Sequence, residues 1–513
     1  MKQLSRTRTA TTKRIAAASL VNRIISMVCR FAVRTVFAES LGKAYLGVGG
    51  MFGNVFGVLS VLEGGVGEAV SQMLYRPLAT HDEVAVTALI RRYRQICRMV
   101  ALVSLAVSLS ILPFLPLLFR DIDRIEHYRG VYLLFCAHQT LSYLYAPCIA
   151  MLSRDRRADT LMNCRSVTTA VSAVCCITLL RRGGSYLLYM AVHIAFHAVD
   201  GLYAALAVRR LYPYLNTLHP AFPDSMRRRL RSQTRSLFVH RVAAAVNQST
   251  DSLLISSVLG LTRMGVFSNY SLIVGTLGSF VSLVLGSAAS SVGNLGATEN
   301  ADKNIDVLKQ LCRIHTLLVT NAAALLLAVI TPVISLWQGR DMCFGSGETA
   351  IITACFFFSY IRDPVQIFLN AYGIFDATKY VYLARALLNL LFSLVFVGRY
   401  GMVGVFAGTL LSTALTALPL EPYLLFRRGF ERPAYSFMLR YFTLMLGGAA
   451  LVFGVNAALF TMPTATPQQI IIKIIVVLAS VNAAFSAAWC FEKGFGNIPA
   501  NIKKGVPENR NAA

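Results

Sequence analysis

Three arginines stand within the first long apolar stretch of the chain. Arg23, Arg30 and Arg34 are spaced i, i+7 and i+11, which places them within about 40° on one face of a helix. An arginine at the bilayer centre costs roughly 2.5–3.5 kcal/mol on insertion scales, so this face is expected to line water or protein. Because guanidinium groups pair bidentately with phosphate oxygens, the face predicts an anionic ligand. Snorkelling from the helix ends is the alternative, and it suits Arg34 best.

A second helix repeats this spacing with other polar groups. His240, Asn247 and Asp251 are again at i, i+7 and i+11, and Arg241 lies 218 positions after Arg23. A polar face on the first helix of each of two similar helical units predicts a central cavity between the units, where transporters bind substrate. The alternative is interhelical hydrogen bonding that only holds the bundle together, and this is the favoured interpretation for Asn247.

Further charged groups fall inside other apolar runs. Glu63 and Glu68 lie in the apolar run at residues 46–75, and Arg362 and Asp363 are adjacent in the run at residues 348–372. Adjacent side chains on a helix diverge by about 100°, so one can face a cavity while the other pairs elsewhere. The acidic groups, with Asp251, are expected to balance charge or to couple transport to a cation gradient.

The composition excludes an ordinary soluble protein. The 513 residues are 56% hydrophobic and only 14% charged, whereas soluble domains carry about 25% charged residues. The net charge of +25 is typical of cytoplasmic loops of membrane proteins, and no RNA-binding motif supports a nucleic-acid partner. The 11 cysteines show neither CxxC nor zinc-ligand spacing, so neither a metal site nor a cofactor is expected.

The apolar runs predict an all-α polytopic membrane protein with 14 transmembrane helices. These lie near residues 14–38, 46–75, 95–119, 130–152, 162–180, 185–208, 236–258, 264–291, 310–337, 348–372, 377–398, 402–426, 436–461 and 468–491. Basic residues concentrate in alternate loops, most densely at 209–235, while the other loops are short. By the positive-inside rule, both termini are expected to be cytoplasmic.

A short internal repeat organises these helices. The pattern LGxxxxGV occurs at Leu41–Val48 and again 218 positions later at Leu259–Val266. Both copies join the first and second helix of a six-helix unit, which predicts two parallel lobes with pseudo-two-fold symmetry. The expected divisions are an N-lobe at 1–230, a C-lobe at 231–432, and two C-terminal helices with a cytoplasmic tail at 433–513. Glycines at GxxxG spacing, at 49, 53 and 57 and at 404 and 408, predict close helix contacts.

Several motifs together resemble a known transporter family. They are Tyr45–Phe52, Leu59–Ala69, Leu74–Ala79, Ser249–Asp251, Leu259–Gly260, Ser268–Tyr270, Gly293–Leu295, Arg362–Pro364, Gly373, Asn389, Gly401–Gly404, Gly408–Thr409 and Glu421–Tyr423. Over most of residues 20–430 the chain resembles the bacterial polysaccharide-transport (Wzx-type) flippases of the multidrug/oligosaccharidyl-lipid/polysaccharide exporter superfamily. Glu68 departs from the small polar residue that the family leads one to expect, which suggests a local change of specificity.

The resemblance implies a flippase of the bacterial inner membrane that works by alternating access. Its expected substrate is an undecaprenyl-pyrophosphate-linked oligosaccharide, moved from the cytoplasmic to the outer leaflet, with a polysaccharide polymerase and chain-length machinery as partners. Arg23, Arg30, Arg34, Arg241 and Arg362 are then expected to attract the anionic headgroup.

Three alternatives remain at this point. An exporter of small organic cations or drugs should have a predominantly acidic cavity. A flippase of the peptidoglycan precursor fits the motifs less well. An enzyme such as a polysaccharide polymerase lacks support, because the outer loops are short and no catalytic constellation is present.

Overall fold

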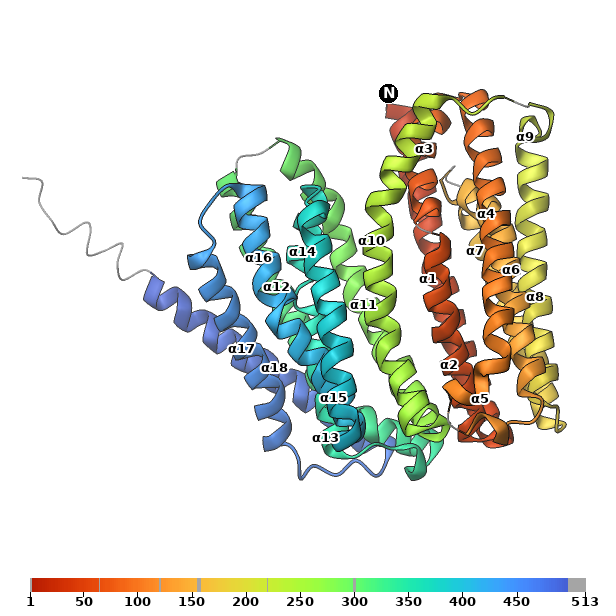
Figure 1. The fold of residues 1–513 in the computed structure, drawn as a ribbon. Helices are drawn as coiled ribbons and strands as arrows, with labels where there is room; N and C mark the ends of the chain where they lie inside the picture. Colours follow the sequence, from red (N-terminus) through yellow and green to blue (C-terminus); the bar gives the residue numbers. More distant parts are fainter. Residues whose placement is uncertain are drawn as a thin grey trace, which may run out of the picture. The chain divides into compact units, whose positions relative to one another are not determined.

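A computed structural model describes residues 2–63, 65–119, 121–154, 158–218, 220–298 and 301–496 (Figure 1). The regular structure of these residues is helical throughout. The first part of the chain forms α1 (Lys2–Leu41), α2 (Lys43–Leu59), α3 (Val66–Ala79), α4 (Glu83–Ile111), α5 (Leu115–Leu118), α6 (Tyr128–Arg154), α7 (Ala158–Arg181), α8 (Tyr186–Leu211), α9 (Tyr214–Thr217) and α10 (Asp224–Leu254). The second part forms α11 (Leu261–Thr298), α12 (Ala301–Gln338), α13 (Ser346–Tyr360), α14 (Asp363–Ala371), α15 (Phe375–Leu415), α16 (Ala417–Leu425), α17 (Tyr435–Ala458) and α18 (Pro467–Gly496).

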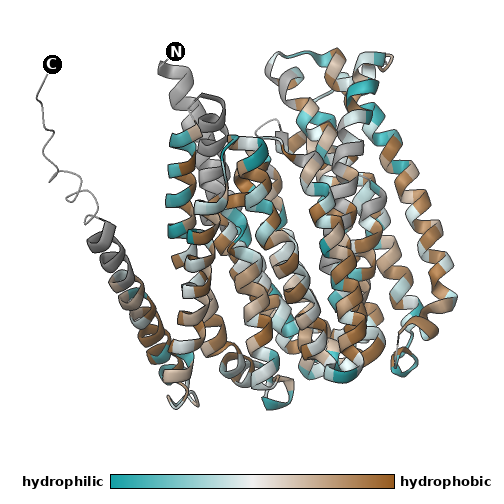
Figure 2. Cartoon of the chain, turned by 60° about the vertical axis from the view of Figure 1, so that its left-hand side comes forward, coloured by the Kyte–Doolittle hydropathy of each residue, from teal (hydrophilic) through white to brown (hydrophobic). Residues whose placement is uncertain are grey.

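Each of the predicted apolar runs is helical over most of its length. Within the described residues, nine helical stretches are long and apolar enough to cross a membrane, and the longest, Ala377–Phe430, has 54 residues. At 1.5 Å per residue that stretch exceeds twice the hydrocarbon thickness, and it contains two of the predicted runs. Hydrophobic residues cover the helix shafts and hydrophilic ones gather towards the connections (Figure 2). The count of fourteen crossings stays a prediction.

The run at 46–75 was expected to be one long helix, and this expectation is wrong. Helix α2 ends at Leu59, a 3-10 turn covers Ser60–Glu63, and α3 begins at Val66. Gly65 between them has φ 73°, a left-handed conformation that glycine adopts without steric cost. The break therefore places Glu63 at an irregular turn between two helices.

Helix α15 folds back on itself at a glycine. Gly401 has φ 57° and ψ −128°, which is outside the helical region. Beyond this bend, a Cβ at Gly404 would overlap the carbonyl of Phe396, and one at Gly408 would overlap Ser393. The two limbs are thus in backbone contact, which confirms the close approach predicted from the glycine spacing in this segment.

The chain divides into two compact units. Unit 1 comprises Met1–Asn269 and Phe375–Ser412, and unit 2 comprises Tyr270–Ile374 and Thr413–Ala513. In unit 1, α6 packs between α4 and α8, and α7 packs along α1. In unit 2, α12 is the central helix and contacts α13, α17 and α18. The lobe boundaries expected at 230 and 432 stay predictions.

Candidate functional site

The two copies of the sequence repeat form matching turns in unit 1. Gly42, between α1 and α2, has φ 86° and ψ −178°. Gly260, between the single π-helical turn after α10 and the start of α11, has φ 91° and ψ 167°. Both lie in a region of backbone space that is essentially restricted to glycine. The same residue at equivalent repeat positions therefore adopts the same unusual conformation.

These turns also contact each other reciprocally. A Cβ on Gly47 would overlap the carbonyl oxygen of Leu261, and a Cβ on Gly265 would overlap the carbonyl oxygen of Lys43. Lys43 and Leu261 are equivalent positions of the repeat, as are Gly47 and Gly265. Exchanging the two copies converts one contact into the other, which is the signature of a local two-fold relation. The two copies of the sequence repeat therefore pack against each other in the structure at these turns.

Gly47→Ala is expected to destabilise unit 1. The added methyl would meet a backbone carbonyl that cannot move aside, and overpacking of this kind costs about 1–3 kcal/mol. Gly53→Ala on the same helix is the matched control, since nothing lies within 4 Å of a Cβ there. Thermal unfolding of the purified variants in detergent should show a lower midpoint for Gly47→Ala alone. Equal midpoints would mean that the turns do not need the close contact.

The arginine face of α1 is partly held by protein groups. Arg34 Nε donates to Asn269 Oδ1 at 2.5 Å, and its Nη2 donates to Ser268 Oγ. Its half-buried guanidinium is therefore fixed by the start of α11, which argues against simple snorkelling. The same two residues belong to one of the motifs that carry the family resemblance, and this contact gives that motif a physical role.

The other two arginines of this face are exposed. Arg30 Nε donates to the carbonyl of Ser26 one turn earlier, at 3.1 Å, and Arg23 is also exposed. Another face of α1 packs on α7, where Asn22 Nδ2 donates to Ser166 Oγ at 3.1 Å. The helix therefore presents positive charge on a face distinct from the one that carries its packing. The side chains of Arg241, His240 and Asn247 lie outside the described part of the structure.

Asp251 is the centre of a small cluster of oxygen atoms in unit 1. Thr409 Oγ1 donates to Asp251, 2.8 Å from Oδ1 and 3.0 Å from Oδ2. Asn389 Oδ1 lies 3.4 Å from the same hydroxyl, and Ser393 Oγ bridges Asn389 Oδ1 and the carbonyl of Val405 at 2.9 and 3.0 Å. Carboxylate, amide, hydroxyl and backbone oxygens are the ligands that hard cations prefer.

Arg362 and Glu421 form a buried ion pair in unit 2. Arg362 Nη1 lies 2.7 Å from Glu421 Oε1, and the two side chains are only 5% and 1% exposed. Asp363, the neighbour of Arg362, is 4.0 Å from His315 Nε2. The adjacent charges therefore take different partners, but not because they diverge on one helix: Arg362 lies in the turn between α13 and α14, and Asp363 begins α14. A headgroup role for Arg362 now requires that its ion pair with Glu421 separate.

Glu421→Gln is expected to destabilise the protein by about 3–5 kcal/mol, because it leaves the charge of Arg362 buried without compensation. Replacing both partners with apolar residues, as in Arg362→Met with Glu421→Leu, should recover most of this loss. Thermal unfolding of the single and double variants measures both effects. A single variant as stable as the wild type would show that the pair does not stabilise unit 2.

The two glutamates near the α2–α3 break lie in unit 1 and have protein partners. Tyr93 Oη donates to Glu63 Oε1 at 3.0 Å, and Gln72 Nε2 donates to Glu68 Oε1 at 3.3 Å. Glu63 thereby ties the irregular turn to α4. Within unit 1, the structure thus places Asp251 in the oxygen cluster and the glutamates at a helix break.

Sequence reasoning missed the partners of these charges. Glu421, Asn389 and Thr409 were noted as parts of motifs but not as members of a site. A carboxylate inside an apolar run was the available signal for Glu421. Asn389 and Thr409 gave no such signal, because single polar neutral residues are common in membrane helices. Among the described residues, no group of three or more His, Cys, Asp and Glu side chains is arranged to hold a metal ion.

The fold is shared with solved transporters. The chain is similar to the lipid II flippase MurJ in an inward closed conformation, with a TM-score of 0.65 and 15% identity over 94% of this chain and 99% of that one. It is also similar to an inward-facing multidrug resistance MATE family transporter of the MOP superfamily, with a TM-score of 0.60 and 14% identity over 83% and 98% of the two chains.

A third similar structure is a MOP superfamily transporter from Pyrococcus furiosus, described by the reverse polarity of its binding pocket, with a TM-score of 0.52 and 13% identity over 86% and 95% of the two chains. No protein-family model matches the chain, and no curated protein matches it at the sequence level. At these identities the likeness establishes the fold. It is an all-helical polytopic membrane fold shared with MOP superfamily transporters.

Proposed function

We propose that the protein is a flippase for undecaprenyl-pyrophosphate-linked oligosaccharides, which it moves from the cytoplasmic to the outer leaflet of a bacterial inner membrane by alternating access. The observation that carries this proposal is the arginine face of α1. Arg23 and Arg30 are exposed on a helix whose other side is packed against α7. Exposed guanidinium groups on a helix that the sequence predicts to cross the membrane suit a pyrophosphate, whose charge offsets the cost of keeping them there.

Arg30→Ala is expected to reduce flipping roughly ten- to a hundredfold, since a hydrogen bond to a charged group contributes about 1.5–3 kcal/mol. The variant is expressed in a deletion strain, and lipid-linked oligosaccharide in the inner leaflet and glycan at the surface are both quantified. Arg30→Lys should recover part of the activity, because it keeps the charge but not the bidentate geometry.

Arg182→Ala is the matched control for this experiment. Arg182 is exposed in the loop between α7 and α8, so its loss changes the net charge equally without touching α1. Full surface glycan with Arg30→Ala would remove Arg30 from the mechanism. Equal loss with both variants would point to a general effect of charge.

The oxygen cluster around Asp251 is proposed to couple this transport to a cation gradient. A cation entering the cluster would replace the Thr409 hydrogen bond to Asp251 and draw together side chains of α10 and α15. Differential cation binding by two conformations shifts their populations, which is what coupling requires. The sodium ion and the proton are both compatible with one carboxylate and several neutral oxygens.

Asp251→Asn is expected to abolish dependence on the gradient while leaving substrate binding intact. The measurement is transport into vesicles under imposed sodium and proton gradients, together with substrate affinity in their absence. Asp200→Asn serves as the control, because Asp200 also accepts a threonine hydrogen bond, from Thr168 Oγ1 at 2.6 Å. A variant at Asp251 that still responds to both gradients would contradict the coupling role.

A flippase of the peptidoglycan precursor is the second candidate. The observation in its favour is the likeness to the lipid II flippase, which extends over 94% of this chain, whereas the MATE transporter covers 83%. The two functions share a pyrophosphate-linked lipid, so the arginine face suits both. Deletion separates them: the lipid-linked species that accumulates would carry either a glycan repeat unit or the peptidoglycan precursor.

An antiporter of organic cations receives less support. Such a cavity should be acidic, whereas α1 exposes arginines. Increased drug sensitivity of a deletion strain with unchanged surface glycans would favour the antiporter.

A further inference from the structure

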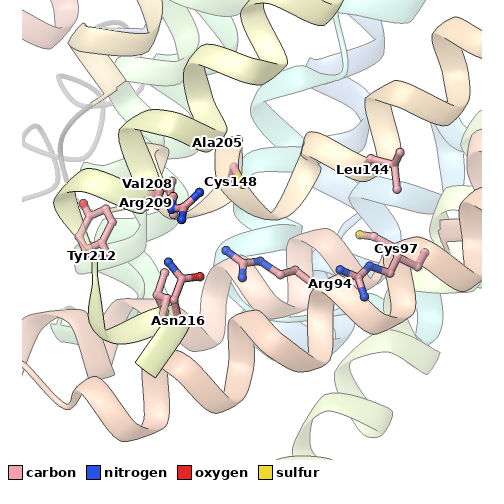
Figure 3. Close-up of a pocket in the computed structure, with 11 residues that line it drawn as sticks. Arg94, Cys97, Leu144, Cys148, Ala205, Val208, Arg209, Tyr212 and Asn216 are labelled. Atoms are coloured by element: carbon pink, nitrogen blue, oxygen red, sulfur yellow. The ribbon is translucent and has the colours of Figure 1, made fainter. Parts of the chain in front are cut away.

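A basic pocket lies at one end of unit 1, away from α1 and from the Asp251 cluster. Its volume is about 330 Å³, within the range of small-ligand sites. Helices α4, α6 and α8 and the segment around α9 enclose it, as Figure 3 shows.

The charged residues of this lining are all basic. Arg94 and Arg98 come from one face of α4 at i and i+4, and Arg209 comes from the last turn of α8. Asn216 and Tyr212 add neutral hydrogen-bonding groups on the side of α9, and Figure 3 shows Arg94, Arg209 and Asn216 around the same space. None of the lining residues is acidic. Converging guanidinium groups repel one another, so an anion between them is favourable.

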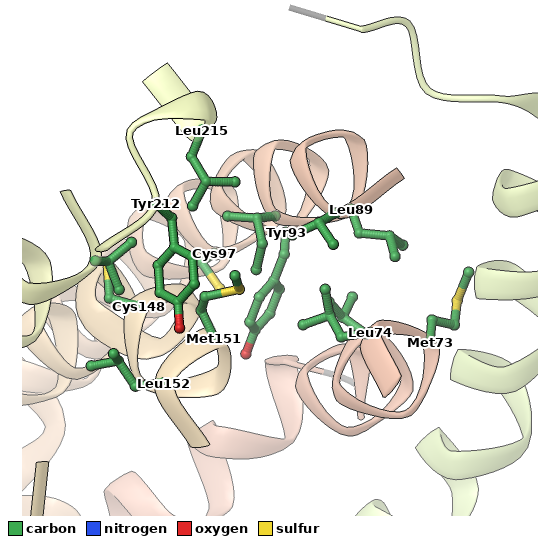
Figure 4. Packing of buried hydrophobic residues seen from close by; sticks show 14 of the residues in the cluster. Met73, Leu74, Leu89, Tyr93, Cys97, Cys148, Met151, Leu152, Tyr212 and Leu215 are labelled. Carbon is green, nitrogen blue, oxygen red and sulfur yellow. The ribbon is translucent and has the colours of Figure 1, made fainter. Parts of the chain in front are cut away.

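The floor of the pocket is rigid. Cys97, Cys148, Val208, Tyr212 and Leu215 line it and also belong to the buried hydrophobic core of unit 1. Figure 4 shows four of these together with the neighbouring core side chains. A site whose walls are core residues is preformed, so little ordering is needed when a ligand binds.

The position of the pocket indicates where its ligand resides. Residues 99–118 of the segment that follows Arg98 carry no charge, so the arginines stand at the border of an apolar span. Leu144, which also lines the pocket, is 45% exposed. The pocket thus joins a basic mouth to an apolar outer wall, the combination expected where a membrane's headgroups meet its hydrocarbon. Basic pockets between transmembrane helices bind anionic lipid headgroups in this way.

We propose that this pocket binds a phosphate group, and that the phosphate belongs to the headgroup of an anionic membrane phospholipid. Arg94 and Arg209 hold the phosphate oxygens from two helices, and Arg98 adds charge at the mouth. The acyl part of the lipid lies along the apolar wall beside Leu144. Binding would clamp α4 to α8, which makes the lipid a structural ligand distinct from any transported substrate. The site stands independently of the proposed flippase activity.

The test uses the full chain, purified in a neutral detergent, with phosphatidylglycerol, phosphatidylcholine and inorganic phosphate as separate probes. Lipid retention is measured by native mass spectrometry, and stabilisation by thermal unfolding. The test variant is Arg94→Gln with Arg209→Gln. Its matched control is Arg92→Gln with Arg210→Gln, on the same two helices and with the same change of charge, but outside the lining.

We expect wild type and control to retain phosphatidylglycerol and to gain stability from it, with phosphatidylcholine without effect. The pocket variant should bind it at least tenfold more weakly, since it loses two charge-assisted contacts. If inorganic phosphate stabilises the wild type and the control but not the pocket variant, the phosphate site is supported. Its ligand is then a soluble phosphate compound and not a lipid headgroup.

Equal retention by the pocket variant and the control, or equal loss in both, would overturn the proposal. Arg98→Gln keeps the test decisive where the double variant fails to fold, because Arg98 is exposed at the mouth and lies outside the packed core. It should weaken lipid binding without lowering the unfolding temperature measured free of lipid. An unchanged lipid affinity for Arg98→Gln would count against the site.

Discussion

The reciprocal contact between the two repeat turns constrains much of unit 1. Gly47 and Gly265 each lie against a carbonyl oxygen of the other copy, so neither position accepts a side chain. The turns at Gly42 and Gly260 set the direction in which α2 and α11 leave their preceding helices. Because α1 and α10 enter these turns, the arginine face and Asp251 both depend on them for position. The close contacts at Gly47 and Gly265 thus help to position the helices that carry the candidate site.

The second constraint is the cost of charge in an apolar environment. The structure meets it in three ways: neutral oxygens hold Arg34, a carboxylate holds Arg362, and a threonine hydroxyl holds Asp251. Internal partners of this kind stabilise Arg34 and Arg362 without a ligand, whereas the oxygen cluster around Asp251 is the site proposed above for a cation. Arg30 differs, since among the described residues its hydrogen bond goes to the carbonyl of Ser26 on its own helix. That difference makes Arg30 the residue most in need of a functional explanation.

The sequence predicted the class of fold and the helical segments because long apolar runs have one stable solution in a membrane. The repeat was also readable, since its glycines are spaced identically in both copies. The break after Leu59 was not predicted, because the sequence stays apolar on both sides of it and glycine is common within membrane helices, so Gly64–Gly65 did not mark an end. The partners Glu421 and Thr409 were not predicted either. They lie 59 and 158 positions from the charges they meet, and no local spacing encodes such pairs.

The central claim is that the protein moves a pyrophosphate-linked lipid across a membrane. The most direct measurement reconstitutes the purified chain in vesicles that contain a fluorescent undecaprenyl-pyrophosphate oligosaccharide, and follows the fraction accessible to a membrane-impermeant quencher. The account predicts translocation that requires the protein and that falls with Arg30→Ala but not with Arg182→Ala. Protein-containing vesicles that translocate this lipid no faster than empty ones, while transporting an organic cation, would contradict it.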